Sequence, residues 1–282
     1  MTLRFHVKQC LAAVSLVLVL SGCSPGSEAN QEDLLMCEDT STWGPAPDLR
    51  QCDLRGFLLY NQDLHGANLA GVDLSETGLH DANLRSANLA GAKLRGDVSG
   101  ADLREADLSN ADLAGVDLTG ADLAGALLDN ANLAGAVLLN ADLANASMIA
   151  VNLGNLVSTF KTFHTNLFGA DLRGADLTRA NLAGANLSEA VLWKAMLDGA
   201  DLSGTNLYGA SFRDASAVGA EFSGVSACGA EFIRTNLSGT KFVSVPGSAA
   251  PGTPGRPWYY LFPCKTSAIF TGAILGDGKR AP

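Results

Sequence analysis

Basic residues are scarce in this sequence. Of its 282 residues, 19 are Lys or Arg and 29 are Asp or Glu, so the formal net charge at pH 7 is −10. Two of the 19 basic residues, Arg4 and Lys8, lie in a segment that we expect to be cleaved off, which leaves 17 basic residues against 29 acidic ones. This balance argues against nucleic-acid binding through a basic face.

The sequence also lacks the motifs that mark common catalytic sites. It has no Gly-rich phosphate loop after a strand, no nucleophile elbow and no metal-spaced cluster of ligands. His65 and His80 are three five-residue units apart, which is not the spacing of a pair on one side of a coil. We predict no catalytic residue, no metal site and no cofactor, and therefore no enzyme.

Long hydrophobic runs are absent apart from one near the start. Leu11 to Leu20 follows Arg4 and Lys8 and is too short to span a bilayer comfortably. We predict that residues 1–22 are a secretory signal. Leu20-Ser21-Gly22-Cys23 resembles the lipobox of bacterial lipoproteins, which implies that Cys23 is acylated, becomes the N-terminus and anchors the chain in a membrane. The alternatives are an ordinary cleaved signal and an uncleaved anchor.

The residues after Cys23 extend this prediction. Ser24 follows the cysteine, which favours the outer membrane where the cell has one and the cell surface otherwise. We expect residues 23–33 to be the lipidated cysteine and a flexible tether. Residues 34–47 lie outside the repeat and are predicted to cap the first coil of a solenoid.

Most of what remains is one five-residue phrase. From Thr165 it reads TNLFG ADLRG ADLTR ANLAG ANLSE AVLWK AMLDG ADLSG TNLYG ASFRD. The first place is small, the second is usually Asp or Asn, the third is Leu or Phe, and the fifth is often Gly. A period of five fits neither an amphipathic helix nor a strand, and short fixed periods are typical of stacked coils.

Each place in the phrase has a physical role in such a coil. The third residue should point inward, and the small first residue should fill the interior space that is left. Gly in the fifth place suits a turn with positive φ, and Asp or Asn in the second can bond its own turn backbone. The period alone allows three or four sides per coil.

These A(D/N)LXX units resemble the pentapeptide-repeat family over most of the chain. The resemblance implies an all-β fold, a right-handed four-sided β-helix solenoid with about twenty residues per coil. The repeat is predicted to cover residues 48–243 with two faults. One residue is missing in 93–103, and in 154–165 we expect Phe160 and Phe163 to fill the core irregularly. About ten coils at ~4.8 Å each would make a rod.

Residues 244–282 should close the rod. A Pro- and Gly-rich loop leads to the aromatic run Trp258, Tyr259 and Tyr260, and AIFTG AILGD then repeats the phrase with Phe270 in the third place. We predict that these two units return to the final coil as part of a lid. The alternative is that the aromatic run joins two rods end to end in a homodimer.

Four cysteines remain in the exported domain, Cys37, Cys52, Cys228 and Cys264. They allow two disulfides in three pairings. Their closeness in sequence favours one bridge at each end, Cys37 with Cys52 and Cys228 with Cys264. The alternative is free thiols, because Cys52 occupies a small inward place where cysteine serves as a compact apolar residue.

Stacked coils also predict columns of residues along the surface. The expected sets are Asp102, Asp122 and Asp142; Asn166, Asn186 and Asn206; Arg173, Trp193 and Arg213 on another side; and Phe168 with Tyr208 on a further side. Trp193 would be placed for cation–π contact. Together with the Trp258–Tyr260 run, the last two sets are the predicted partner-binding surface. The alternative is that these side chains are ordinary solvent-exposed residues of the coils and bind no partner.

These features predict a lipid-anchored protein of the bacterial cell envelope. It would be a protein-binding or structural module with an unidentified protein partner, held to the membrane through Cys23. The alternative comes from the family resemblance: some members are acidic DNA mimics that bind DNA gyrase. The acidity fits that alternative, whereas the signal peptide directs the protein away from gyrase.

Overall fold

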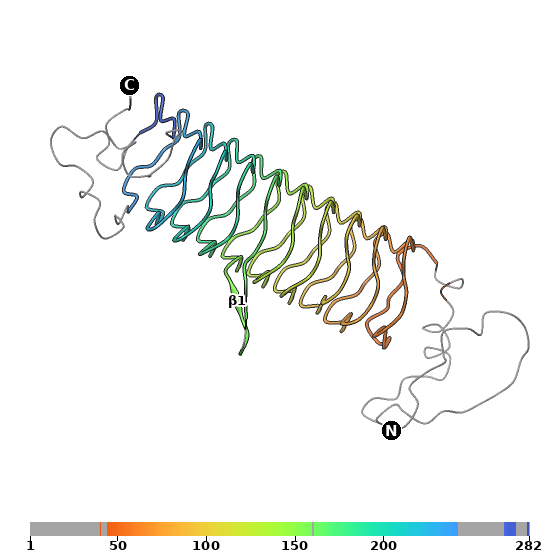
Figure 1. The fold of residues 1–282 in the computed structure, drawn as a ribbon. Helices are drawn as coiled ribbons and strands as arrows, with labels where there is room; N and C mark the ends of the chain where they lie inside the picture. Colours follow the sequence, from red (N-terminus) through yellow and green to blue (C-terminus); the bar gives the residue numbers. More distant parts are fainter. Residues whose placement is uncertain (1–39, 41–43, 160, 242–267, 275–280, 282) are drawn as a thin grey trace, which may run out of the picture.

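The computed structural model describes residues 40, 44–159, 161–241, 268–274 and 281. These residues form a rod of stacked coils from which one hairpin projects (Figure 1). The hairpin holds the two regular strands of the described residues, β1 (Leu156–Val157) and β2 (Thr162–Phe163), which pair antiparallel. The predicted signal, Cys23, the tether, most of the cap, Cys37, Cys264 and the Trp258–Tyr260 run lie outside the described residues.

Each corner of a coil is a tight turn whose geometry follows from the phrase. The Ala126 amide donates to the Leu123 carbonyl at 3.0 Å, and Gly125 between them has a φ of 70°. The second-place Asp122 accepts the Ala124 amide at 3.1 Å. The predicted roles of the second and fifth places are thus confirmed, and Asn145 shows that a non-Gly residue can also take the positive φ, here 59°.

Successive coils are joined by parallel single-residue bridges. Leu123 donates to the Asp142 carbonyl at 2.7 Å, and Asp142 donates to Ala121 at 3.0 Å. Four such columns run along the rod, through Asp102, Asp107, Asp112 and Asp117, which shows that the coil has four sides. The fold is the all-β, right-handed four-sided β-helix that the repeat predicts.

The core is made of the third and first places. Leu123 and Leu172 are fully buried, and alanines such as Ala121 and Ala170 fill the space beside them. This alternation of large and small side chains fills the interior of each coil at close-packed density, and Val116 and Val151 show that Val is also accommodated in the first place. Burial of the third place confirms the predicted phase through all three runs, including Val98 after the missing residue.

The first fault changes only the number of residues in one coil. Bridges that normally join residues 20 apart, as Asp63 and Asn83 do, join residues 19 apart across it, as in Asn83 with Asp102. Because Val98 still points inward, the missing residue shortens one corner and leaves the layers aligned.

The second fault is the projecting hairpin, and here the sequence prediction for Phe163 is wrong. Phe163 lies on β2 and is 41% exposed, while Phe160 lies outside the described residues. Val137 bridges directly to Asn166, so the added residues leave the stack and the coil resumes in register. Leu156 packs over the bare corner at Gly135, where a Cβ would lie 2.6 Å from the Leu156 Cβ.

At the C-terminal end the core changes from leucine to phenylalanine. Phe212 stacks on Phe232 at a ring distance of 4.8 Å, and Phe270 stacks on the other side of Phe232 at 5.0 Å. Ile269 bridges to Glu231 and Ile274 bridges to Asn236. Residues 268–274 therefore continue the stack beyond residues 242–267.

Cysteines near both ends of the rod are oxidised. Cys52 and Cys228 are each disulfide-bonded, so neither is a free thiol. They lie in coils too far apart to be joined to each other, because a disulfide needs Cα atoms within about 7 Å. The pairing of Cys37 with Cys52 and of Cys228 with Cys264 stays a prediction, because Cys37 and Cys264 lie outside the described residues.

Candidate functional site

The surface columns define two faces that carry the candidate residues. The Asp face is the side that carries Asp102, Asp122, Asp142 and Asp171, which bridge in that order. The Asn face is the adjacent side that precedes the Asp face in each coil, and on it Asn166, Asn186 and Asn206 bridge in the same way. The predicted Asp and Asn columns are confirmed.

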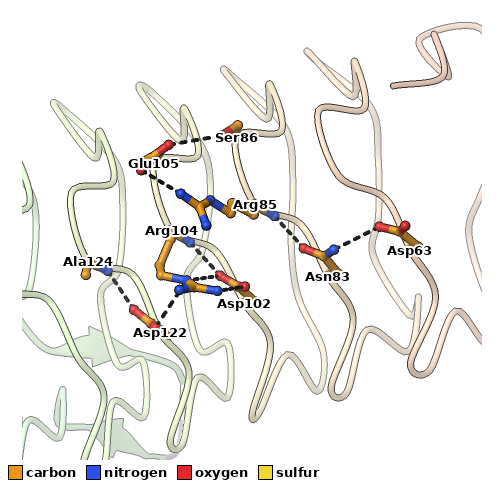
Figure 2. A network of polar contacts seen from close by, with 9 residues as sticks. All are labelled: Asp63, Asn83, Arg85, Ser86, Asp102, Arg104, Glu105, Asp122 and Ala124. Carbon is orange, nitrogen blue, oxygen red and sulfur yellow. Dashed lines mark hydrogen bonds and ion pairs between the residues drawn. The ribbon is translucent and has the colours of Figure 1, made fainter. Parts of the chain in front are cut away.

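The N-terminal half of the Asp face is a network of acidic rungs crossed by arginine, shown in Figure 2. Arg104 pairs with Asp102 in its own coil and reaches Asp122 in the next coil, with Nε 3.4 Å from Oδ2. Arg85 bonds Glu105 at 3.0 Å one coil on. The Arg104 guanidinium holds the pKa of the Asp102 carboxyl below its usual value, although partial burial opposes this shift.

The C-terminal half of the Asp face carries the predicted Arg–Trp column. The Arg213 guanidinium lies 5.4 Å from the Trp193 ring centroid, a cation–π contact, and Trp193 is 42% exposed. The Trp193 Nε1 donates to the Ser211 Oγ at 2.8 Å. Arg173, one coil before Trp193, pairs with Asp171. The predicted alignment of the three residues and the contact at Trp193 are confirmed.

The predicted division of these columns among sides is wrong in two respects. Asp142 bridges to Asp171 across the hairpin, so the acidic column and the Arg–Trp column share the Asp face. Phe168 and Tyr208 belong to the same units as Asn166 and Asn206 and therefore lie on the Asn face. The candidate partner residues on the rod thus divide between two adjacent faces.

Two features escaped the sequence reading. The hairpin exposes Val157 to 74%, and Lys161 lies with its Nζ 4.6 Å from the Phe163 ring centroid. On the third face, which carries Leu127 and Met196 in the second place, Asp198 reaches into the next coil. The role of Asp198 could have been predicted from the sequence. In the units ALLDN and AMLDG, an apolar residue replaces Asp or Asn in the second place, and an Asp stands in the fourth place instead.

The histidines lie on different faces, as their spacing predicts. His65 is on the Asp face and His80 on the Asn face, where the His80 Nε2 lies 2.9 Å from Asp81 and its Nδ1 lies 2.9 Å from the Ser99 Oγ. Within the described ranges, no group of three or more His, Cys, Asp or Glu could hold a metal ion. No helix in the part of the chain that the structure describes could cross a membrane.

The family model for pentapeptide repeats matches the chain in eight copies. The matched residues are 48–81, 63–96, 97–133, 121–155, 165–204 and 205–242. These ranges cover more than half of the sequence and coincide with the four-sided coils. The chain belongs to the pentapeptide-repeat family.

Solved structures of the family resemble the rod. HetL, a pentapeptide repeat protein involved in heterocyst differentiation regulation in the cyanobacterium Nostoc sp. PCC 7120, is 31% identical, with 80% of this chain and 92% of that chain covered and a TM-score of 0.55. QnrB1, a plasmid-mediated fluoroquinolone resistance protein, is 18% identical over 66% of this chain and 91% of that chain, with a TM-score of 0.39. No curated protein sequence matches this chain.

Proposed function

We propose that this protein is exported, anchored by a lipidated Cys23, and acts at the cell envelope as a non-catalytic protein-binding or structural module. The observation that carries the binding role is the Arg–Trp column of the Asp face. Trp193 is held by Arg213 above its ring and by Ser211 at its indole nitrogen, so an exposed aromatic side chain is fixed in one orientation. Rigid, exposed Trp and Arg are the residue types that dominate protein interfaces.

The charge of the same face supports a protein partner. Arg213 lies 3.9 Å from Glu231, and Arg234 pairs with Asp214 at 2.5 Å, so both signs alternate around Trp193. Alternating charges fix the register of a partner and reject mismatched ones more than they add affinity. Most Asp and Asn side chains of the repeat are committed to turn bonds, which supports the absence of catalysis.

The anchor is tested with Cys23→Ser in the native host. We expect this variant to leave the membrane fraction and to lose labelling by radioactive palmitate, while the wild type keeps both. An unlabelled, uncleaved form that stays in the membrane would show an uncleaved signal anchor instead. A wild-type protein found in the cytoplasm with gyrase would favour the DNA-mimic alternative.

The partner surface is tested by photocrosslinking in intact cells. A photoreactive amino acid at position 193 should give a crosslink to a protein, and one at position 203, on the opposite face, should not. Ser203 is a matched control because it also occupies the outward fourth place of its unit. Equal crosslinking from both positions, or none from 193, would contradict a protein-binding role for the Asp face.

A further inference from the structure

The Asn face beside the hairpin combines side-chain amides with aromatic rings on three consecutive coils. Its three coils read TNLFG, ANLSE and TNLYG, so their outward side chains are amides, a hydroxyl and two aromatic rings. The one carboxylate in them, Glu189, occupies the corner and leans along it, since a Cβ on Gly209 would lie 3.5 Å from its Cγ. On these three coils the flat part of the Asn face carries no charged side chain.

The backbone of this face is flat and closed. Leu167 donates to the Asn186 carbonyl at 2.7 Å, Leu187 donates to the Asn206 carbonyl at 2.8 Å, and Asn206 donates to Ala185 at 3.0 Å. A peptide strand binds a sheet through unpaired backbone groups at its edge, and here those groups are paired between coils. Nucleic acid would need basic residues on the face, which it lacks. A ligand must be recognised by the side chains and must be neutral.

The amide column offers hydrogen-bonding groups that are only partly used. Asn186 donates its Nδ2 to the Asn166 Oδ1 at 2.9 Å, but its own Oδ1 is occupied by the amide and the hydroxyl of Ser188, at 3.2 and 2.6 Å. The Asn206 Nδ2 consequently has no acceptor among the described residues. Asn206 is exposed and accepts only the Tyr208 amide through its oxygen.

The Asn side chains on the fourth face of the rod, in contrast, find acceptors within the protein. There Asn181 donates to Asn152 and Asn152 donates to Asn132, both at 2.9 Å, and Asn132 donates to the Asp112 carboxylate at 3.1 Å. That chain of amides is satisfied within the protein. The Asn face ends instead on an open amide beside an exposed tyrosine.

Two aromatic residues on this face lie a fixed distance apart along the rod. Phe168 and Tyr208 occupy the same outward place two coils apart, which is about 10 Å along the rod axis. Tyr208 is 54% exposed and Phe168 is partly buried. Cys228, in the same place one coil further on, is disulfide-bonded, and the hairpin stands at the other end. The open part of the face therefore extends from Phe168 to Tyr208.

From this arrangement we propose that the Asn face binds an extended, uncharged β-1,4-linked glycan that carries N-acetyl groups. In such a chain alternate sugar rings present the same C–H face, and two rings span a length similar to the separation of Phe168 and Tyr208. Those C–H faces pack on aromatic rings. The open Nδ2 of Asn206, beside Tyr208, can donate a hydrogen bond to the acetamido carbonyl oxygen of a sugar stacked there.

This inference goes beyond the proposed function, because it requires neither the lipid anchor nor a protein partner and uses a different face. The test is calorimetric titration of the full chain in detergent micelles with the hexamer of β-1,4-linked N-acetylglucosamine. Saturable binding is expected, and α-1,4-linked maltohexaose, which is curved and lacks acetamido groups, should not bind. Because the face is uncharged, the affinity should not change with salt, unlike that of a charged protein interface.

The variants address the two parts of the site. Tyr208→Ala should weaken binding at least about tenfold, the loss of one stacking contact. Asn206→Asp should also weaken it, and it keeps the fold because Asp is common in the second place. Tyr60→Ala is the matched control: an exposed tyrosine on the same face near the N-terminal end. No saturation at millimolar hexamer, full affinity in both site variants, or equal binding of maltohexaose would overturn the proposal.

Discussion

At the scale of single residues, one hydrogen bond recurs along the rod and explains the second place of the phrase. A carboxylate or amide oxygen there accepts the amide of the fourth place, as Asp176 does from Thr178 at 2.9 Å. Where the second place is Ser216, the bond comes from the previous coil: the Asp198 Oδ1 accepts the Val218 amide at 2.9 Å and the Ser216 hydroxyl at 2.6 Å. The same exchange joins Asp129 to Ile149 at 3.0 Å.

Because the acceptor of this amide can lie in either of two places, we predict that a second substitution can restore the stability lost by a first. Asp198→Ala should lower the free energy of unfolding by about 1 to 2 kcal/mol, because the Val218 amide and the Ser216 hydroxyl both lose their acceptor. Adding Ser216→Asp should recover much of that loss, because Asp in the second place can accept the Val218 amide within its own unit. Urea unfolding of both variants measures the difference.

Ser216→Asp alone is the control for the rescue. It places a second carboxylate beside Asp198 and should destabilise the protein through like-charge repulsion. If Asp198→Ala is no less stable than the wild type, the bond between coils contributes nothing. If the double variant is no better than Asp198→Ala, the second place cannot take over the role.

At the scale of elements, the coils could be predicted from the sequence and the hairpin could not. Each unit repeats the same local rule, so the burial of Leu172 follows from that of Leu167 five residues earlier. Residues 154–165 break the rule once, and their apolar residues suggested a core. Phe163 is outside because Val137 finds its bridge partner in Asn166 without help from the extra residues.

The candidate site on the Asn face could likewise be predicted from the sequence only in part. Its amide column could be predicted from the period, but the open Nδ2 of Asn206 could not. The Asn206 Nδ2 is left without an acceptor because the Ser188 hydroxyl, and not the Asn206 side chain, donates a hydrogen bond to the Asn186 Oδ1. That competition lies between coils, and one repeat unit carries no information about its neighbour twenty residues away.

The hairpin should be removable without loss of the fold. Deleting Leu156 to His164 joins Asn155 to Thr165 and restores the phrase as VNLGN TNLFG. Asn155 then takes the fifth place, where Asn140 and Asn145 already adopt positive φ. Loss of the Leu156 contact is offset by the lower entropy cost of a shorter loop, so the free energy of unfolding should change by about 1 kcal/mol or less.

Deletion of residues 154–165 is the matched control. It also removes the corner residues Gly154 and Asn155 together with Thr165, whose hydroxyl donates to the Gly154 carbonyl at 2.8 Å. Without them the chain cannot turn the corner, and thermal unfolding should show a large loss of stability. If both deletions unfold the protein equally, the hairpin is part of the structural core.

At the scale of the whole molecule, the paired carboxylates should make the rod sensitive to acid. The neighbouring arginines Arg55, Arg104 and Arg234 lower the pKa values of Asp53, Asp102 and Asp214 respectively. A carboxyl whose folded pKa is below its unfolded value of about 3.9 contributes stability at neutral pH that is lost as the pH falls through the folded pKa.

The melting temperature should therefore stay level from pH 7 to about pH 5 and fall below about pH 4. Asp102→Asn should lower the melting temperature at pH 7 and reduce the drop between pH 7 and pH 3, because the group that titrates has been removed. Each effect should be small, since these pairs are largely exposed. Ser203→Ala should leave the pH profile unchanged. A wild-type profile that is flat to pH 3 would exclude a role for these pairs in stability.

The C-terminal units should act as the last layer of the rod. Ile269 donates to the Ala230 carbonyl at 2.8 Å and accepts the Phe232 amide at 2.7 Å, while Phe270 covers the Phe232 ring. A chain that ends at Val243 loses these bonds and exposes the edge of the coil, which is prone to pair with other chains. We expect a lower melting temperature and a larger mass by light scattering.

Phe270→Ala separates the two contributions of that layer, because it keeps the backbone bridges and removes only the ring. It should lower the melting temperature less than truncation does and leave the protein monomeric, since the strand edge stays covered. The competing view, that residues 244–282 join two rods end to end, requires a dimeric parent and a truncated chain that is a stable monomer. A truncated protein with unchanged melting temperature and mass would show that residues 268–274 contribute no stability to the rod.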